Sequence, residues 1–241
     1  RSPADCFYAA IEAARIALEH MTPVILLSDG TIANGTEPFR IPDLATLPRI
    51  EVKARGEVEG FRPYMRDAKL ARPWVVPGQP GMEHRVGGLE KEDGTGRVST
   101  DGANHERMIL LREAKVARVA ESYAPLGVEG APEGDLLVVA WGSTYGAARS
   151  AVASLNARGE RVGHVHLRHL HPLPPDLAPR MARYREVVVP ELNRGQLAGV
   201  LRAETLRDVR SIPKLRGQPF KEAELGDALA RHLPAREENR A

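Results

Sequence analysis

The sequence predicts an α/β fold with a parallel sheet, and three observations within residues 134–174 carry that prediction. Residues 136–140 form an unbroken apolar run, which is typical of a strand covered on both faces. A helical pattern of alanines with Val152 and Leu155 follows and stops at Gly159, where a glycine can end a helix. Residues 161–170 return as a second strand. Since such strands are joined by a right-handed crossover, the segment is a βαβ unit.

The turn after the first of these strands is a candidate binding site. Gly142 allows a sharp turn, and Ser143 or Thr144 can cap the helix that follows. A helix N-terminus with free N–H groups can take a phosphate or a carboxylate. The alternative is a capped helix after a tight turn, with no ligand.

A second polar loop, Glu191–Gln196, follows a later predicted strand. Ligands of open parallel sheets bind beyond the carboxyl ends of the strands, so both loops are expected on one rim. The predicted cofactor-binding residues are Gly142, Ser143, Thr144, Asn193 and Gln196.

The remainder of the chain after this unit continues as strands and helices. Residues 187–190 predict a third parallel strand and residues 197–206 a helix. Residues 209–212 predict a short strand and residues 221–233 a last helix. The result is an α/β sandwich of about four strands.

The first residues predict a helix followed by a strand. Ser2 is a good N-cap and Pro3 fits the first helical position of a helix that reaches about His20. Residues 23–28 then read as a short buried strand. A lone strand cannot make a sheet, so its partners lie later in the chain or in sequence before Arg1. We favour the second alternative.

Residues 29–104 show no persistent helical or strand period, and glycine and proline recur throughout. The segment is either a disordered linker or an irregular segment ordered by packing on a partner surface. Its apolar residues favour the second interpretation, because disordered linkers are poor in them. They are Phe61, Tyr64, Trp74, Val75 and Val76. Residues 105–123 then predict an amphipathic helix, and the Gly/Pro-rich residues 125–133 the best domain boundary.

Composition excludes several classes of function. The 34 basic and 32 acidic residues nearly balance, which gives no electrostatic case for nucleic acid. No stretch approaches the roughly 20 apolar residues that cross a bilayer, and the first residues carry no signal-peptide pattern. We therefore expect a cytoplasmic protein without membrane contacts. The single cysteine, Cys6, is expected in the core and cannot hold an iron–sulfur cluster, which usually takes four thiolates.

Four histidines, at positions 164, 166, 169 and 171, suggest a metal site at first sight. His164 and His166 would share one face of a strand, and two imidazoles can ligate zinc. No nearby cysteine or acidic third ligand completes a tetrahedral set, so we predict no metal site. Ser143 lacks a Gly-x-Ser-x-Gly turn, so hydrolysis is unsupported.

A series of short motifs extends along almost the whole chain. They are Pro23–Asp29, Phe61 with Tyr64, Gly88–Glu90 with Asp93 and Gly96, Asn104–His105 with Met108, Arg112 and Lys115, Trp141–Ser143, and Glu191–Gln196. In this order and spacing they resemble the carboxyl-terminal part of the alpha subunit of 2-oxoacid:ferredoxin oxidoreductases, nearest to the 2-oxoglutarate type. One departure is visible, because Lys91 stands where we expect histidine.

The resemblance implies an enzyme that cleaves a 2-oxoacid with thiamine diphosphate, passes electrons through an iron–sulfur cluster to ferredoxin, and gives an acyl-CoA and carbon dioxide. It also implies a beta subunit that holds the diphosphate, Mg²⁺ and the cluster, and a dimer of alpha–beta pairs. Residues 1–34 would be the tail of a pyrimidine-binding domain. Residues 35–130 would be an irregular connecting segment with one helix. Residues 131–241 would resemble a transketolase carboxyl-terminal domain.

The family's pyrimidine-contacting glutamate and its substrate-binding motif are expected before Arg1. We therefore predict no catalytic residue in this chain, which alone would be inert. It would brace the active site, assemble the dimer and shape the approach of CoA, whose phosphates suit a helix N-terminus. The alternative from another class is a non-catalytic ligand-binding or assembly module, with an anion site at the helix start formed by Gly142, Ser143 and Thr144.

Overall fold

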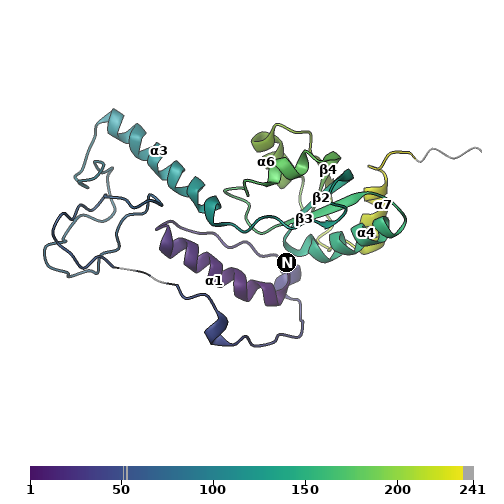
Figure 1. Ribbon diagram of the computed structural model, residues 1–241, viewed down its shortest axis with the longest axis horizontal. Coiled ribbons are helices and arrows are strands. Elements are labelled where there is room, and N and C mark those ends of the chain that lie inside the picture. The colour runs from purple at the N-terminus through teal and green to yellow at the C-terminus, as the bar shows by residue number, and fades with distance from the viewer. Residues whose placement is uncertain (51, 53, 236–241) are drawn as a thin grey trace, which may run out of the picture. The chain divides into compact units, whose positions relative to one another are not determined.

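A computed structural model describes residues 1–50, 52 and 54–235 (Figure 1). The chain forms two compact units. The sheet unit comprises Arg1–Cys6, Leu27–Pro38 and the chain from Ala124 onward, and the helix unit comprises Phe7–Leu26 and Phe39–Tyr123. Each unit draws on separate segments of the chain, so the predicted domain boundaries at residues 34 and 130 stay a prediction.

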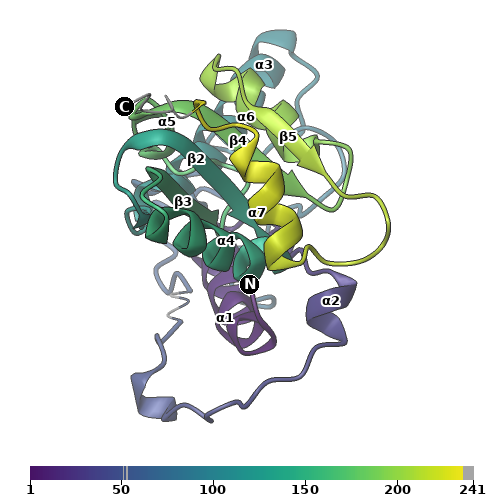
Figure 2. The same cartoon turned by 90° about the vertical axis from the view of Figure 1, so that its right-hand side faces the viewer.

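A five-stranded sheet forms the centre of the sheet unit (Figure 2). Its order is β1-β3-β2-β4-β5, with β2 parallel to β3 and β4, β4 parallel to β5, and β1 antiparallel to β3. The strands are β1 (Glu129–Gly130), β2 (Gly134–Trp141), β3 (Val162–Leu167), β4 (Tyr184–Glu191) and β5 (Arg210–Pro213). In the register, Val138 of β2 lies opposite His164 on one side and Val188 on the other.

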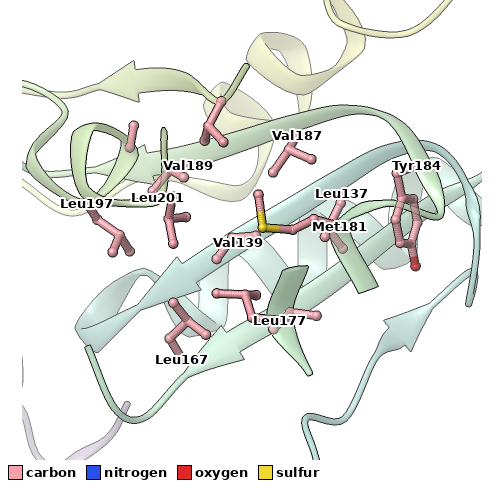
Figure 3. Close-up of a cluster of buried hydrophobic side chains, with 13 residues drawn as sticks. Leu137, Val139, Leu167, Leu177, Met181, Tyr184, Val187, Val189, Leu197 and Leu201 are labelled. Atoms are coloured by element: carbon pink, nitrogen blue, oxygen red, sulfur yellow. The ribbon is translucent and has the colours of Figure 1, made fainter. Parts of the chain in front are cut away.

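Helices cover both faces of this sheet. The helical elements of the sheet unit are α2 (Gly30–Ala33), the 3-10 turn η3 (Gly142–Thr144), α4 (Tyr145–Ala157), α5 (Leu177–Met181), α6 (Gln196–Thr205) and α7 (Glu222–Ala230). Side chains of α4 and α7 pack with Leu136 and Val138 on one face. Those of α5 and α6 pack with Leu137 and Val139 on the other face (Figure 3). Because successive strand residues point to opposite faces, β2 is buried on both sides.

The predicted α/β class and βαβ unit are confirmed by β2, α4 and β3. Gly159 has φ +85° and its N–H donates to the carbonyl of Asn156, which ends α4 as expected. Three short elements of the sheet unit were missed. The edge strand β1 lies in the predicted linker, and α2 lies in the segment predicted to be irregular. The helix α5 occupies five residues of a loop. Helices as short as α2 and α5 show no helical period.

The helix unit holds most of α1 (Pro3–Glu19), the 3-10 turn η1 (Leu44–Thr46), α3 (Gly102–Arg118) and the 3-10 turn η2 (Val119–Ser122). Both long helices were predicted. The Ser2 hydroxyl accepts from the Asp5 N–H (3.3 Å) as the predicted cap of α1. No helix in the described part of the chain is long and apolar enough to cross a membrane.

The irregular segment between α2 and α3 packs on helices of its own chain. The Trp74 indole donates to the carbonyl of Leu18 in α1 (2.8 Å), and the Arg66 guanidinium donates to the sulfur of Met108 in α3 (3.4 Å). Ala71 and Met82 are buried. The described residues of this segment thus contact α1 and α3 of the same chain, and packing on a partner surface stays a prediction.

The predicted buried strand at residues 23–28 is wrong for this structure. These residues belong to no strand or bridge among the described residues, and Ile25 is 84% exposed. An apolar run favours burial, but a strand also needs a neighbour to pair with its N–H and C=O groups. The described residues provide no such neighbour here.

Candidate functional site

The turn between β2 and α4 lies at the carboxyl edge of the sheet, as predicted. The Thr144 hydroxyl donates to the carbonyl of Trp141 (2.7 Å). The Ser143 N–H donates to the carboxylate of Asp29 (3.2 Å), 114 residues earlier in the chain. The same carboxylate accepts the N–H groups of Thr31 and Ile32 in α2 (3.0 and 3.1 Å). The Ser143 amide, which could have met an external anion, therefore has a carboxylate partner already.

Asp29 is an anion at neutral pH. Burial raises its pKa, but hydrogen bonds from Ser143, Ile32 and Thr31 outweigh that effect and hold the pKa below the usual 3.8. A negative charge beside a helix start is stabilised by the helix dipole and by free N–H groups. Asp29 thus ties α2 to the start of α4 inside the sheet unit.

Replacing Asp29 tests this link. We expect Asp29→Ala to lower the free energy of unfolding by about 1–2 kcal/mol, as loss of a helix cap does. Because the folded-state pKa is lowered, the stabilisation is present above about pH 4 and declines as the pH falls further. Urea unfolding of the full-length protein measures both. Asp43→Ala is the matched control, since Asp43 caps only the adjacent turn η1 (Ala45 N–H, 2.9 Å); equal losses in the two variants would contradict the prediction.

The second loop at this edge joins β4 to α6. The Asn193 side-chain carbonyl accepts the N–H groups of Gly195 and Gln196, both at 2.9 Å. The carboxylate of Glu191, fully buried at 0% exposure, accepts the N–H groups of Leu197 (2.8 Å) and Ala198 (3.1 Å). The start of α6 is therefore satisfied by side chains of its own loop.

The five predicted cofactor-binding residues lie at these two helix starts. The backbone N–H groups of Ser143, Gly195 and Gln196 donate to side chains of the chain itself. Both helix starts carry a carboxylate, from Asp29 and from Glu191. A cofactor-binding role for the predicted set stays a prediction; the set is Gly142, Ser143, Thr144, Asn193 and Gln196.

The histidines of β3 lie on one face, as predicted. His164 is buried and its Nδ1 lies 2.8 Å from the Glu129 carboxylate, which also accepts from the Tyr145 hydroxyl (2.9 Å). The His166 ring lies 4.9 Å from that of Tyr145. Burial, aided by the charge of neighbouring His164, lowers the pKa of His166 to about 3. No group of three or more His, Cys, Asp and Glu residues in the described part of the chain could hold a metal ion.

In the helix unit, a carboxylate cluster joins the Gly88–Gly96 segment to α3. Glu90 pairs with both guanidinium N–H groups of Arg112 (3.2 Å each) and with Nδ1 of His105 (3.0 Å). Hydrogen bonds from Arg112 oppose the effect of burial and, with those from His105 and the Lys91 N–H, lower the pKa of Glu90 to about 2. Glu90 thus contacts two motif residues, His105 and Arg112, that lie on α3.

A second set of contacts continues this cluster. The Asn104 side chain accepts the Asp93 N–H (3.0 Å) and donates to the carbonyl of Lys91 (2.9 Å). Asp93 forms ion pairs with Arg66 and with Arg107 (2.8 Å to the latter). Lys91 is buried, and its ammonium donates to the carbonyls of Gly87 (2.7 Å) and Leu89. The unexpected lysine therefore closes its own loop.

The Glu90 cluster predicts a distinct acid response. A lowered folded-state pKa means that the stabilisation is present above about pH 4.5 and lost as the pH falls toward 2. Since solvent screens these side chains, we expect about 1–2 kcal/mol rather than the roughly 3 of the full shift. Glu90→Gln should therefore be less stable than the parent at pH 7, and this difference should be clearly smaller at pH 2.5, in denaturant unfolding. Glu83→Gln, an exposed site of the same unit, should match the parent at both values; a constant gap for Glu90→Gln would refute the prediction.

Comparison with known proteins identifies the family of this chain. The family model "Pyruvate flavodoxin/ferredoxin oxidoreductase, thiamine diP-bdg" matches residues 1–101, and "Pyruvate:ferredoxin oxidoreductase core domain II" matches residues 134–221. The 2-oxoglutarate oxidoreductase subunit KorA of Mycobacterium tuberculosis is 48% identical over 98% of the chain. The chain belongs to the 2-oxoacid:ferredoxin oxidoreductase family. This confirms the family predicted from the motifs.

Other members of this oxidoreductase family match more distantly. The 2-oxoglutarate synthase subunit KorA of Archaeoglobus fulgidus is 30% identical over 80% of the chain. The structure of 2-oxoglutarate:ferredoxin oxidoreductase from Magnetococcus marinus, with 2-oxoglutarate, coenzyme A and succinyl-CoA bound, matches with a TM-score of 0.88 and 30% identity over 95% of the chain. The chain spans only 36%, 48% and 41% of the lengths of these three proteins.

Sequence reasoning missed two residues that form the contacts described above in the sheet unit. Asp29 was recognised only as the end of a motif, and nothing local signals its bond to Ser143. Glu129 was assigned to a linker, although it is the acidic group beside His164. Its one signal is a polar residue at the end of the apolar Leu126–Val128 stretch, which is too short to establish a strand.

Proposed function

We propose that the chain is the carboxyl-terminal part of the alpha subunit of a 2-oxoglutarate:ferredoxin oxidoreductase. In the proposed reaction a 2-oxoacid and CoA give an acyl-CoA and carbon dioxide. Two electrons leave the substrate and reduce two ferredoxin molecules by one electron each. The observation that carries the proposal is the 48% identity, over 98% of the chain, to a 2-oxoglutarate oxidoreductase subunit.

The cofactors would be held mainly outside this chain. Thiamine diphosphate supplies the electron sink that carbanion chemistry on a 2-oxoacid needs, and residues 1–101 match a thiamine-diphosphate-binding family model. The described residues contain no group of three or more His, Cys, Asp and Glu residues that could hold a metal ion. One cysteine cannot supply the thiolates of an iron–sulfur cluster. We propose, as the family resemblance implies, that a beta subunit holds Mg²⁺ and the cluster.

The chain's own contribution would be structural. The sheet unit has a buried core on both faces of its parallel strands. Inside the helix unit, the ion pairs of Glu90 and Asp93 hold the residue 88–96 segment on α3. The exposed apolar residues around Ile25 lack a strand neighbour among the described residues. We propose that a pyrimidine-binding domain covers them and that the subunit pairs with a beta subunit in a dimer of alpha–beta pairs.

An activity assay of the full-length protein, purified with any chains that accompany it, tests this function. We expect ferredoxin reduction that requires both 2-oxoglutarate and CoA and that is slower with pyruvate. Omitting CoA serves as the control for unrelated reduction. No reduction with either 2-oxoacid, in the presence of thiamine diphosphate and Mg²⁺, would contradict the proposal.

A non-catalytic ligand-binding module is the alternative. It would place an anion at the start of α4, next to Gly142, Ser143 and Thr144. The Asp29 carboxylate lies 3.2 Å from the Ser143 nitrogen, so an added anion there would meet a like charge. This contact favours the oxidoreductase over the alternative.

A further inference from the structure

A cavity of about 210 Å³ lies within the helix unit, and its charged lining is entirely basic. Arg66, Arg72, Arg112 and Lys115 line it together with Tyr64, Met108 and further apolar residues. None of its described lining residues is acidic. Four cations without a carboxylate in one cavity are an unusual arrangement, because like charges repel and each loses hydration.

Two of these cations are neutralised by carboxylates beside the cavity. Arg112 pairs with Glu90 (3.2 Å), and Arg66 pairs with Asp93. Both arginines therefore have a carboxylate partner among the described residues, which Arg66 shares with Arg107.

The other two cations have only uncharged partners in the described structure. Arg72 donates to the carbonyl of Pro63 (3.3 Å), and its guanidinium carbon lies 4.4 Å from the centre of the Tyr64 ring. Lys115 donates to the carbonyl of Met21 (2.7 Å). Neither forms a described ion pair with a carboxylate. Two positive charges therefore face the cavity without compensation.

Lys115 is destabilised as a cation by its surroundings. Burial lowers its pKa, and the charges of Arg72, Arg66 and Arg112 lower it further. The lysine lies on one face of α3 with Met108 and Arg112, so the helix holds its ammonium at the cavity. An anion in the cavity would remove this repulsion and add charge-assisted hydrogen bonds.

We propose that this cavity binds a small dianion, either a phosphate group or a dicarboxylate, between Arg72 and Lys115. An arginine presents a planar fork of donors and a lysine a mobile point charge, and the pair matches two oxyanion charges. The volume is below the roughly 300–1,000 Å³ of pockets for drug-sized ligands, which suits a compact anion. The proposed site consists only of residues of the helix unit and does not rest on the oxidoreductase reaction proposed above.

Calorimetric titration of the full-length protein, with any accompanying chains, tests the site. Inorganic phosphate and succinate are the two dianion probes, and acetate is the monoanion control, all at low ionic strength. We expect at least one dianion to bind more tightly than acetate. Arg72→Gln should weaken that binding about tenfold or more, as loss of a charge-assisted hydrogen bond does. Arg85→Gln, at an exposed arginine of the same unit that does not line the cavity, should bind like the parent.

A second variant, Lys115→Met, distinguishes loss of anion binding from a folding defect. It keeps an apolar stem and removes the repelled charge together with one hydrogen bond to the Met21 carbonyl, so its melting temperature without anions should change little, while dianion binding should be lost. Binding of phosphate alone would identify a phosphate site, and binding of both probes a general dianion site. Absence of dianion binding in the assembled protein would overturn the proposal, as would equal affinities in the parent and Arg72→Gln.

Discussion

Glu191→Ala is expected to lower the free energy of unfolding by about 2–5 kcal/mol. The Glu191 carboxylate is fully buried and accepts the N–H groups of Leu197 and Ala198 at 2.8 and 3.1 Å. Truncation would leave two buried donors without a partner, at about 1–3 kcal/mol each, and would open a small cavity. Both amides belong to the first turn of α6, where no intrahelical carbonyl can replace the carboxylate.

Denaturant unfolding of the full-length protein measures this loss. Glu204→Ala is the matched control, because Glu204 is an exposed residue of the same helix. It should change stability by no more than about 0.5 kcal/mol. If the two alanine variants unfold at the same denaturant concentration, the Glu191 carboxylate does not support α6.

Gly163→Ala is expected to cost about 2–4 kcal/mol, although it adds one methyl group. A Cβ at Gly163 would lie 2.2 Å from the Tyr184 hydroxyl oxygen and 2.8 Å from the carbonyl of Ala131. Tyr184 is buried, and its hydroxyl donates to that carbonyl at 2.6 Å. The strand β3 must therefore move, or the tyrosine must leave its position and its hydrogen bond.

A double variant separates steric overlap from a general intolerance of β3. Tyr184→Phe removes the nearest atom, so Gly163→Ala should cost less in that background than in the parent. Gly199→Ala is the control, since a Cβ at this helical residue would meet no described atom within 4 Å beyond its own helix backbone. It should stabilise the protein by up to about 1 kcal/mol. Unfolding data in which the two glycine replacements agree would refute the steric explanation.

Two carboxylates at the carboxyl edge of the sheet occupy the positions where we expected the phosphates of CoA. Asp29 and Glu191 each occupy the amides at a helix start. Phosphates of CoA, which we expected at such a start, would meet negative charge at both places. We therefore expect CoA phosphates, if they contact the sheet unit, to bind cationic side chains rather than these backbone amides.

The sequence by itself determined the elements whose signal is local. The apolar run of β2, the helical spacing of α4 and the stop at Gly159 are contained in one short segment, so periodicity and turn chemistry predicted the βαβ unit. The ordered series of motifs likewise predicted the family. Their meaning as contacts was not visible, because Glu90 and Arg112 meet only when the chain folds onto α3.

Only the tertiary structure decided which groups bind the amides at the helix starts and whether residues 23–28 are buried. The bond from Ser143 to Asp29 joins positions 114 residues apart, and the apolar run around Ile25 is exposed. The physical reason is common to both. Local patterns record what a segment can form, whereas its hydrogen-bond partners and its burial depend on which distant segment lies beside it.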